Sequence, residues 1–141
     1  YAEVLLNYAE AINETGKTDL AYAPLIALRD RAGIAAGDDK LYGLKASMTK
    51  EQMREIIRNE RRVELAFEDH RWNDIRRWKI AMDVSNGYNK RMRIIKNANN
   101  TYTYQVTESI RRHNFRPEMY LLPIPDSEIR KAPAMLQNPG W

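Results

Sequence analysis

Cysteine is absent from the sequence, and histidine occurs only as His70 and His113. Disulfide bonds and thiolate metal sites are therefore excluded, and so is a metal site rich in histidine. The sequence also lacks a nucleophile paired with a base, a glycine-rich phosphate loop and any cofactor motif. We therefore expect a protein that is not an enzyme and that uses neither a metal nor a cofactor.

Long apolar runs are absent as well. No run approaches the roughly 20 residues that cross a bilayer, and no secretion signal is visible, so the chain reads as soluble. Its 141 residues, 43% of them hydrophobic, suffice for one domain with a real core. The 23 Lys and Arg against 19 Asp and Glu give a net charge of +4 without a concentrated basic block, which predicts no particular partner.

Apolar periodicity predicts a first helix over residues 1–14 and a second over about 19–32, which together form an antiparallel hairpin. Pro24 should make the second helix begin late or kink, because a proline inside a helix removes a backbone hydrogen bond. The face of the first helix that we expect to be buried carries Leu5, Tyr8, Ala9 and Ile12. The corresponding face of the second helix carries Ala21, Leu25, Leu28 and Ala32.

The most densely patterned stretch runs from Arg58 to Lys79 and mixes charged with large apolar residues. Thr49 can cap a helix that begins at about Lys50, and Gln52 completes the pattern of a capping box. One stripe of this helix recurs at intervals of four and three and should face the core. Its members are Met53, Ile57, Glu60, Glu64, Phe67 and Arg71.

Glu60, Glu64 and Glu68 follow one another at i,i+4 spacing, so their like charges repel and cations must offset them. We expect a partly buried lattice of ion pairs with arginines, whose paired donors match carboxylates. The candidate arginines are Arg61, Arg62, Arg71, Arg76 and Arg77. The interspersed acids nearly cancel these arginines, which argues against nucleic-acid binding.

A remote alternative for the glutamates is a glycoside hydrolase that uses Glu60 and Glu64 as its two carboxylates. The surroundings of the glutamates distinguish the two interpretations. Arginines within hydrogen-bond distance support the structural lattice, whereas a glutamate that is open to a cleft and free of arginine supports catalysis.

A turn at Asp69 to Trp72 should lead into a further helix that ends near Ala81, which makes two helical hairpins in tandem over residues 1–81. The layout is similar to tetratricopeptide repeats, whose concave grooves bind peptides, so a helical protein-interaction scaffold is the alternative function. Trp72 and Trp78 on this helix either stack against sugars or pack into the core, and aromatic residues at helical spacing usually pack.

From Asn86 onward the apolar period becomes two, which predicts a β-hairpin over residues 86–107 with a turn at 97–100. Because the alternation leaves one face polar, the hairpin should lie against the helices. A basic cluster follows that is either solvated or contacts a phosphate or an acidic sugar. It comprises Arg111, Arg112, His113 and Arg116.

Prolines exclude a helix and a central strand over residues 120–125, so this segment should run extended through a groove of the helical region. Asp126 should cap a short helix over residues 127–131. Asn138 to Gly140 should form a turn that lets Trp141 close the core.

Four segments, in order, resemble the SusD/RagB family of cell-surface nutrient-binding lipoproteins, which partner TonB-dependent transporters. They are LNYAEAINETG with LRDRAGI (residues 6–16 and 28–34), ERRVELAFEDHRWNDIRRW (60–78), YLLPIPDSEI (120–129) and QNPGW (137–141). The resemblance is to the carboxy-terminal portion of such proteins, and a start at Tyr1 without a helix cap also indicates a fragment.

The resemblance implies a non-catalytic glycan-binding component of an outer-membrane uptake complex. Its partners would be a SusC-like TonB-dependent transporter and an oligosaccharide or other nutrient, with no nucleic acid, and its lipid anchor would lie outside this fragment. None of the four segments is a ligand-binding motif. The candidate sugar-stacking residues are aromatic side chains outside the helices, and burial would exclude them: Tyr42, Tyr88, Tyr102 and Tyr104.

Taken together, the sequence predicts a mainly α fold in one domain over residues 1–141. Tetratricopeptide-like helical hairpins occupy residues 1–81, and a small β-hairpin occupies residues 86–107. An extended proline-rich segment, a short helix and a closing turn occupy residues 108–141.

Overall fold

The computed structural model describes residues 1–141 and divides them into two compact units, Tyr1–Asn73 and Asp74–Trp141. The first unit is helical, and the second contains a two-stranded antiparallel sheet together with short helices. The expected fold class, mainly α with a small β-hairpin, is therefore confirmed. The expectation of one domain over residues 1–141 stays a prediction.

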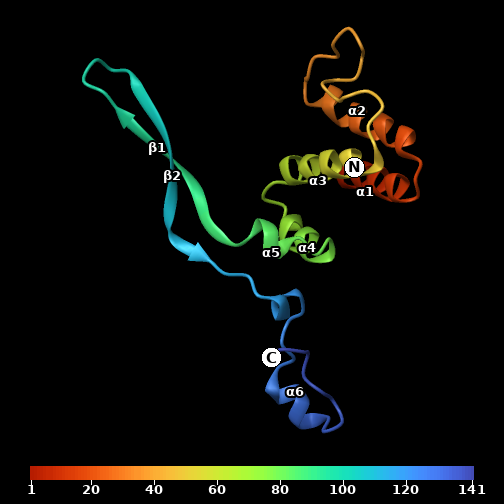
Figure 1. Ribbon diagram of the computed structural model, residues 1–141, viewed down its shortest axis with the longest axis vertical. Helices are drawn as coiled ribbons and strands as arrows, with labels where there is room; N and C mark the ends of the chain where they lie inside the picture. The colour runs from red at the N-terminus through yellow and green to blue at the C-terminus, as the bar shows by residue number, and fades with distance from the viewer. The chain divides into compact units, whose positions relative to one another are not determined.

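Three helices build the first unit, namely α1 (Ala2–Glu14), α2 (Tyr22–Arg31) and α3 (Lys50–Glu64) (Figure 1). Helix α1 packs against both α2 and α3. A 3-10 turn, η1 (Thr18–Ala21), precedes α2, so the helix begins late, as Pro24 predicted. Pro24 lies in the first turn of α2, where a missing N–H costs no helical hydrogen bond.

Gly33 follows the end of α2. Its φ of 77° is a left-handed conformation that glycine adopts without a steric penalty. The Gly33 N–H donates to the carbonyl of Asp30 at 2.9 Å, and the Ile34 N–H donates to that of Arg29 at 3.0 Å. These bonds satisfy carbonyls that the helix leaves without partners. The loop that follows is anchored by Leu44, whose side chain is buried.

The core of the first unit lies between the three helices. Its fully buried side chains are Leu6, Leu25, Leu28, Met53, Ile57 and Asn13. On α1 the buried residues are Leu6, Ala9 and Asn13, whereas Tyr8 is 55% exposed, so the predicted face of α1 is partly wrong. Ala32 is also exposed, because α2 ends at Arg31 and Ala32 lies beyond its buried stripe.

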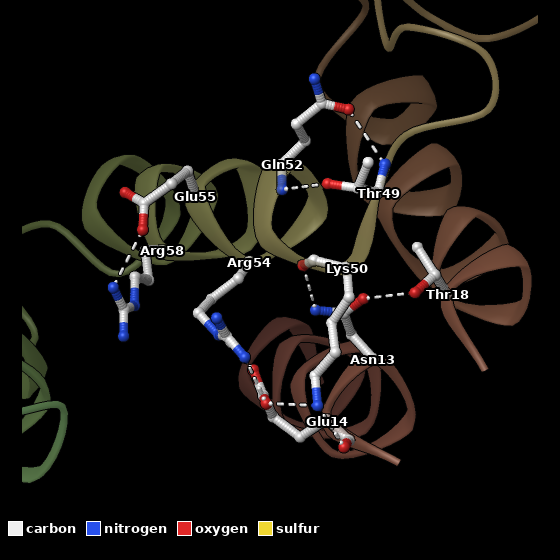
Figure 2. Close-up of polar contacts among 9 residues, drawn as sticks. All are labelled: Asn13, Glu14, Thr18, Thr49, Lys50, Gln52, Arg54, Glu55 and Arg58. Atoms are coloured by element: carbon white, nitrogen blue, oxygen red, sulfur yellow. Dashed lines mark hydrogen bonds and ion pairs between the residues drawn. The ribbon is translucent and has the colours of Figure 1, made fainter. Parts of the chain in front are cut away.

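The capping box at the start of α3 is present (Figure 2). The Thr49 hydroxyl accepts from the Gln52 N–H at 3.2 Å, and the Thr49 N–H donates to Gln52 Oε1 at 2.9 Å. Two N–H groups at the helix start thereby gain partners. The predicted beginning of this helix at Lys50 is confirmed.

The end of α3 differs from the prediction, because the helix stops at Glu64 and turns follow over residues 65–69. Phe67 and Asp69 have φ values of 67° and 61°, which are left-handed and incompatible with a continuing helix. Phe67 is fully exposed instead of facing the core. Glu68 also lies outside the helix, so the predicted row of three glutamates is reduced to Glu60 and Glu64.

Two short helices follow, α4 (His70–Arg77) and α5 (Ala81–Val84), where one helix to about Ala81 was predicted. A left-handed Lys79, with a φ of 57°, separates them. In the second unit a small core forms from Ile75, Ala81 and Phe115. The Asn86 side chain holds the backbone of Phe115 in place. It accepts from the Phe115 N–H at 2.5 Å and donates to the Phe115 carbonyl at 3.2 Å.

The β-hairpin pairs β1 (Gly87–Lys96) with β2 (Tyr102–His113) and is longer than the predicted 86–107 (Figure 1). The Asn97 side chain closes the turn by donating to Thr101 Oγ1 at 2.9 Å and to Thr103 Oγ1 at 3.0 Å. A register shift lies between Tyr88 and Lys90. Both faces of the hairpin carry exposed side chains, so the helices of its own unit leave the apolar face uncovered.

The proline-containing segment follows a 3-10 turn, η2 (Pro117–Tyr120). The Gln137 side chain accepts from the Ile124 N–H at 2.8 Å and donates to the Ile124 carbonyl at 2.9 Å. Leu121 and Leu122 are 52% and 66% exposed. The expected passage of this segment through a groove of the helical region stays a prediction. The next helix, α6 (Asp126–Lys131), has Pro125 as its N-cap, and Asp126 is its first residue instead of the predicted cap.

The predicted turn at the end of the chain is present, because the Trp141 N–H donates to the Asn138 carbonyl at 3.2 Å. Gly140 has a φ of 89°, which suits the third position of a type II turn. Trp141 is 43% exposed, so the prediction that it plugs the core is wrong. Its indole N–H instead donates to the carbonyls of Glu118 and Leu121, at 3.1 and 3.2 Å.

Candidate functional site

Glu60 lies in an arginine fork. Arg29 of α2 donates from Nη2 to Glu60 Oε2 at 2.8 Å and from Nε to the same oxygen at 3.2 Å. The side chains are only 14% and 16% exposed, which makes this a largely buried ion pair. A bidentate arginine contact occupies a carboxylate with two charge-assisted hydrogen bonds. This environment supports the structural role that we predicted for Glu60.

Glu64 pairs with Arg31, also from α2, through one guanidinium nitrogen, and the Arg31 side chain is 59% exposed. The ion pairs predicted for Glu60 and Glu64 are therefore present. Their partners, however, are arginines of α2 and not the predicted arginines of the stretch from Arg58 to Lys79. Arg29 and Arg31 come close to α3 only because the helices pack together. Arg61 is buried on α3 and donates to Asn7 Oδ1 of α1 at 2.6 Å.

Glu14, at the end of α1, forms a second ion-pair site that the sequence analysis did not identify (Figure 2). Arg54 Nε lies 2.6 Å from Glu14 Oε1, and Lys50 Nζ lies 3.2 Å from Oε2. The Arg54 hydrogen bonds, followed by those of Lys50, lower the pKa of Glu14 to about 2. Beside it, buried Asn13 donates to the Lys50 carbonyl at 2.9 Å, so α1 is tied to the start of α3.

Tyr42, the candidate sugar-stacking residue of the first unit, is half-buried in the loop after α2. Arg29 donates to its carbonyl at 3.0 Å, so the arginine that holds Glu60 also holds this loop. The hydrogen bond of the Tyr42 hydroxyl to Asp30 raises the pKa of the phenol. The ring is therefore positioned by contacts at its backbone and at its hydroxyl.

The other three candidates lie on the β-hairpin and are exposed, with Tyr88 at 48%, Tyr102 at 52% and Tyr104 at 64%. In the antiparallel register Tyr88 is opposite Arg112, Tyr102 is opposite Lys96, and Tyr104 is opposite Ile94. Side chains two residues apart on a strand share a face, so the register brings these three tyrosines to one face of the hairpin. None of the four candidates is buried beneath other side chains.

The two tryptophans have different surroundings. Trp72 is half-exposed and lines, with Phe67, a hollow of about 510 Å³ in the first unit. Trp78 is half-buried, and the Arg77 guanidinium lies 4.6 Å from the centre of its ring. That cation–π contact covers one ring face and supports the packing role of Trp78. Phe67 was missed as an exposed aromatic because the helical pattern placed it in the core.

The basic cluster does not act as one patch. Arg111 and Arg112 lie on β2, the His113 ring is 3.0 Å from the Asn89 amide, and Arg116 forms an ion pair with Glu118 at 3.0 Å. Elsewhere, no three His, Asp or Glu side chains are grouped so that they could hold a metal ion. None of the helices has the length and the apolar character needed to cross a membrane.

The segments that carried the family resemblance bond to one another within each unit. Arg29 binds Glu60 in the first unit. In the second, Arg76 donates to the Tyr120 carbonyl at 2.7 Å, and Gln137 binds the backbone of Ile124. These contacts support the interpretation of the matched segments as structural.

Comparison with known proteins gives the same family for the whole chain. The description "SusD family" matches residues 1–141. Two curated relatives come from Formosa agariphila: "SusD-like protein P2" is 33% identical over 145 residues, and "SusD-like protein P25" is 32% identical over 137 residues. These alignments cover 100% and 97% of this chain but 25% and 22% of the relatives.

A solved structure named BT4246 has a TM-score of 0.73 and 34% identity, over 99% of this chain and 23% of that protein. The chain therefore spans about a quarter of the length of the relatives that it matches. The match of the family over all 141 residues, with two relatives above 30% identity, settles the assignment: this chain belongs to the SusD family.

Proposed function

We propose that the chain serves in a glycan-binding component of an outer-membrane uptake complex, where it captures a polysaccharide and hands it to a SusC-like TonB-dependent transporter. The observation that carries this proposal is the family match over residues 1–141. In keeping with the family, the protein would be a lipid-anchored protein exposed at the surface of the outer membrane.

The proposed function involves no chemistry on the glycan. A glycoside hydrolase needs one carboxyl group that donates a proton and a second that attacks or activates water. Glu60 is held by the two strong hydrogen bonds of Arg29, and Glu64 is held by Arg31. Carboxylates that are occupied by arginines in this way favour a role in joining α2 to α3 over a role in proton transfer.

The helices would serve as a scaffold. We propose that the hairpin of α1 and α2 and the pair of α3 and α4 are tetratricopeptide-like repeats, and that residues 1–141 belong to one domain. The packing of α1 against α2 and against α3 supports this arrangement.

The sugar-binding side chains that we propose are Tyr42, Tyr88, Tyr102 and Tyr104. Flat aromatic rings suit the C–H faces of sugar rings, and all four phenols are at least partly exposed. The three on the hairpin share one face, which permits contact with several units of a single glycan chain.

Isothermal calorimetry with a panel of neutral and acidic polysaccharides tests the proposal. We expect at least one polysaccharide to bind, and we expect Tyr104→Ala to weaken that binding while Tyr8→Ala, an exposed tyrosine on α1, leaves it unchanged. Binding of none of the panel, or equal loss in both variants, would contradict the proposed site.

A further inference from the structure

The β-hairpin has a marked excess of positive charge, because it holds six of the 23 Lys and Arg residues of the chain but only one of its 19 Asp and Glu residues. Between Gly87 and His113 one acid, Glu108, stands against six Lys and Arg side chains. These are Lys90, Arg91, Arg93, Lys96, Arg111 and Arg112. All six are exposed, and none of them forms an ion pair with an acid of its own unit. Exposed cations without acidic partners create a local field that attracts a polyanion.

The strand register divides these cations between the two faces of the hairpin. Lys96 lies directly opposite Tyr102, and Arg112 lies directly opposite Tyr88. Side chains in such cross-strand pairs are close neighbours, with Cβ atoms about 5 Å apart. Each end of the tyrosine face therefore combines a phenol ring with a cation. Arg91 and Arg93 alternate with these positions and belong to the opposite face.

An exposed apolar path leads from the Tyr102–Lys96 pair toward the Tyr88–Arg112 pair, and the charged cross-strand neighbours Lys90 and Glu108 lie between the end of this path and Tyr88. Met92, Ile94, Tyr104 and Val106 lie between the pairs and are 55%, 59%, 64% and 64% exposed. From Tyr88 to Lys96 the strand rises by roughly 27 Å, at about 3.4 Å per residue. A ligand that engages both pairs must therefore be an extended chain, because a single sugar reaches only one of them.

We propose that this face of the hairpin binds an extended polysaccharide that bears acidic groups, and this inference rests on the glycan-binding function proposed above. Sugar rings lie on Tyr88 and Tyr102, and the acidic groups of the same chain pair with Arg112 and Lys96. The apolar path between the pairs accepts the C–H faces of the intervening sugars. Charge selects acidic glycans over neutral ones, and the spacing of the pairs selects long chains over short ones.

The test uses the 141-residue chain and polygalacturonate, a polysaccharide with a carboxylate on each unit, in a calorimetric titration at low salt. The double variant Lys96→Gln with Arg112→Gln removes both cations from the tyrosine face. We expect its dissociation constant to rise about tenfold or more, because two charge-assisted contacts are lost. The matched control, Arg91→Gln with Arg93→Gln, removes the same charge from the opposite face and should change the constant by no more than about threefold.

Other results would overturn the inference. If both double variants weaken binding equally, the net charge of the hairpin accounts for the affinity and the tyrosine face does not. If neither variant changes the dissociation constant, the hairpin is not the binding site. An uncharged glucan that binds as tightly as polygalacturonate would refute the acidic class while leaving the proposed function intact. If the chain binds no polysaccharide, both proposals fail. If the unaltered chain sediments as a dimer and the Tyr104→Ser variant as a monomer, the tyrosine face binds a second copy of the chain instead of a glycan.

Discussion

At the scale of single residues, the Arg29–Glu60 pair is a largely buried polar contact between α2 and α3. Breaking one partner of a largely buried pair leaves the other charge without compensation. We expect Glu60→Ala to lower the free energy of unfolding by about 3 kcal/mol, measured by urea denaturation. Glu55→Ala is the control, because the Glu55 side chain is 71% exposed and its pair with Arg58 should contribute less than about 1 kcal/mol. Equal effects of the two variants would refute the assignment.

Glu14 makes stability depend on pH. Its pKa is lowered from 4.5 to about 2 in the folded chain, so unfolding raises the affinity of this carboxyl group for a proton. Its contribution is therefore fully present above pH 4.5 and is lost as the pH falls through about 2. We expect urea midpoints to fall between pH 5 and pH 2 by less in Glu14→Gln than in the unaltered chain. Parallel pH profiles would show that Arg54 and Lys50 do not stabilise the ionised form.

At the scale of elements, the capping box sets the start of α3. Thr49→Ala removes the acceptor for the Gln52 N–H and should cost about 1 kcal/mol of stability, whereas Thr49→Ser keeps the hydroxyl and should cost much less. Thermal unfolding of both variants measures the difference. If Thr49→Ser is as unstable as Thr49→Ala, the side-chain hydroxyl is not the stabilising group.

The elements also show what the sequence could predict. Signals between near neighbours were reliable: the Thr49 and Gln52 pattern marked the start of α3, and alternation marked the hairpin. The end of α3 was missed because the helical pattern continues through Phe67, whereas the backbone turns left-handed there. No short-range signal opposed the pattern.

Contacts between elements were harder to predict. The arginines that bind Glu60 and Glu64 are more than 30 residues away, on α2, and only helix packing brings them together. Partners for these glutamates were expected within the stretch from Arg58 to Lys79, because arginines are dense there. The candidate tyrosines could be selected because they lie outside the helices, but their pairing with Lys96 and Arg112 required the strand register.

At the scale of the whole molecule, we assign different roles to the two units. The helical unit supplies packed structure with its glutamates held by arginines, and the hairpin of the other unit supplies exposed rings and cations. Membership of the SusD family is the basis of our proposal that both units serve in glycan uptake. The central claim is capture of a polysaccharide without cleavage.

The most direct test of that claim combines a binding titration with analysis of the ligand afterwards. Polysaccharide bound by the chain is recovered after long incubation, and its length and reducing ends are measured beside a sample without protein. We predict binding together with recovery at full length. Reducing ends that accumulate with the unaltered chain but not with Glu60→Gln would contradict the account and assign the chain to the hydrolases.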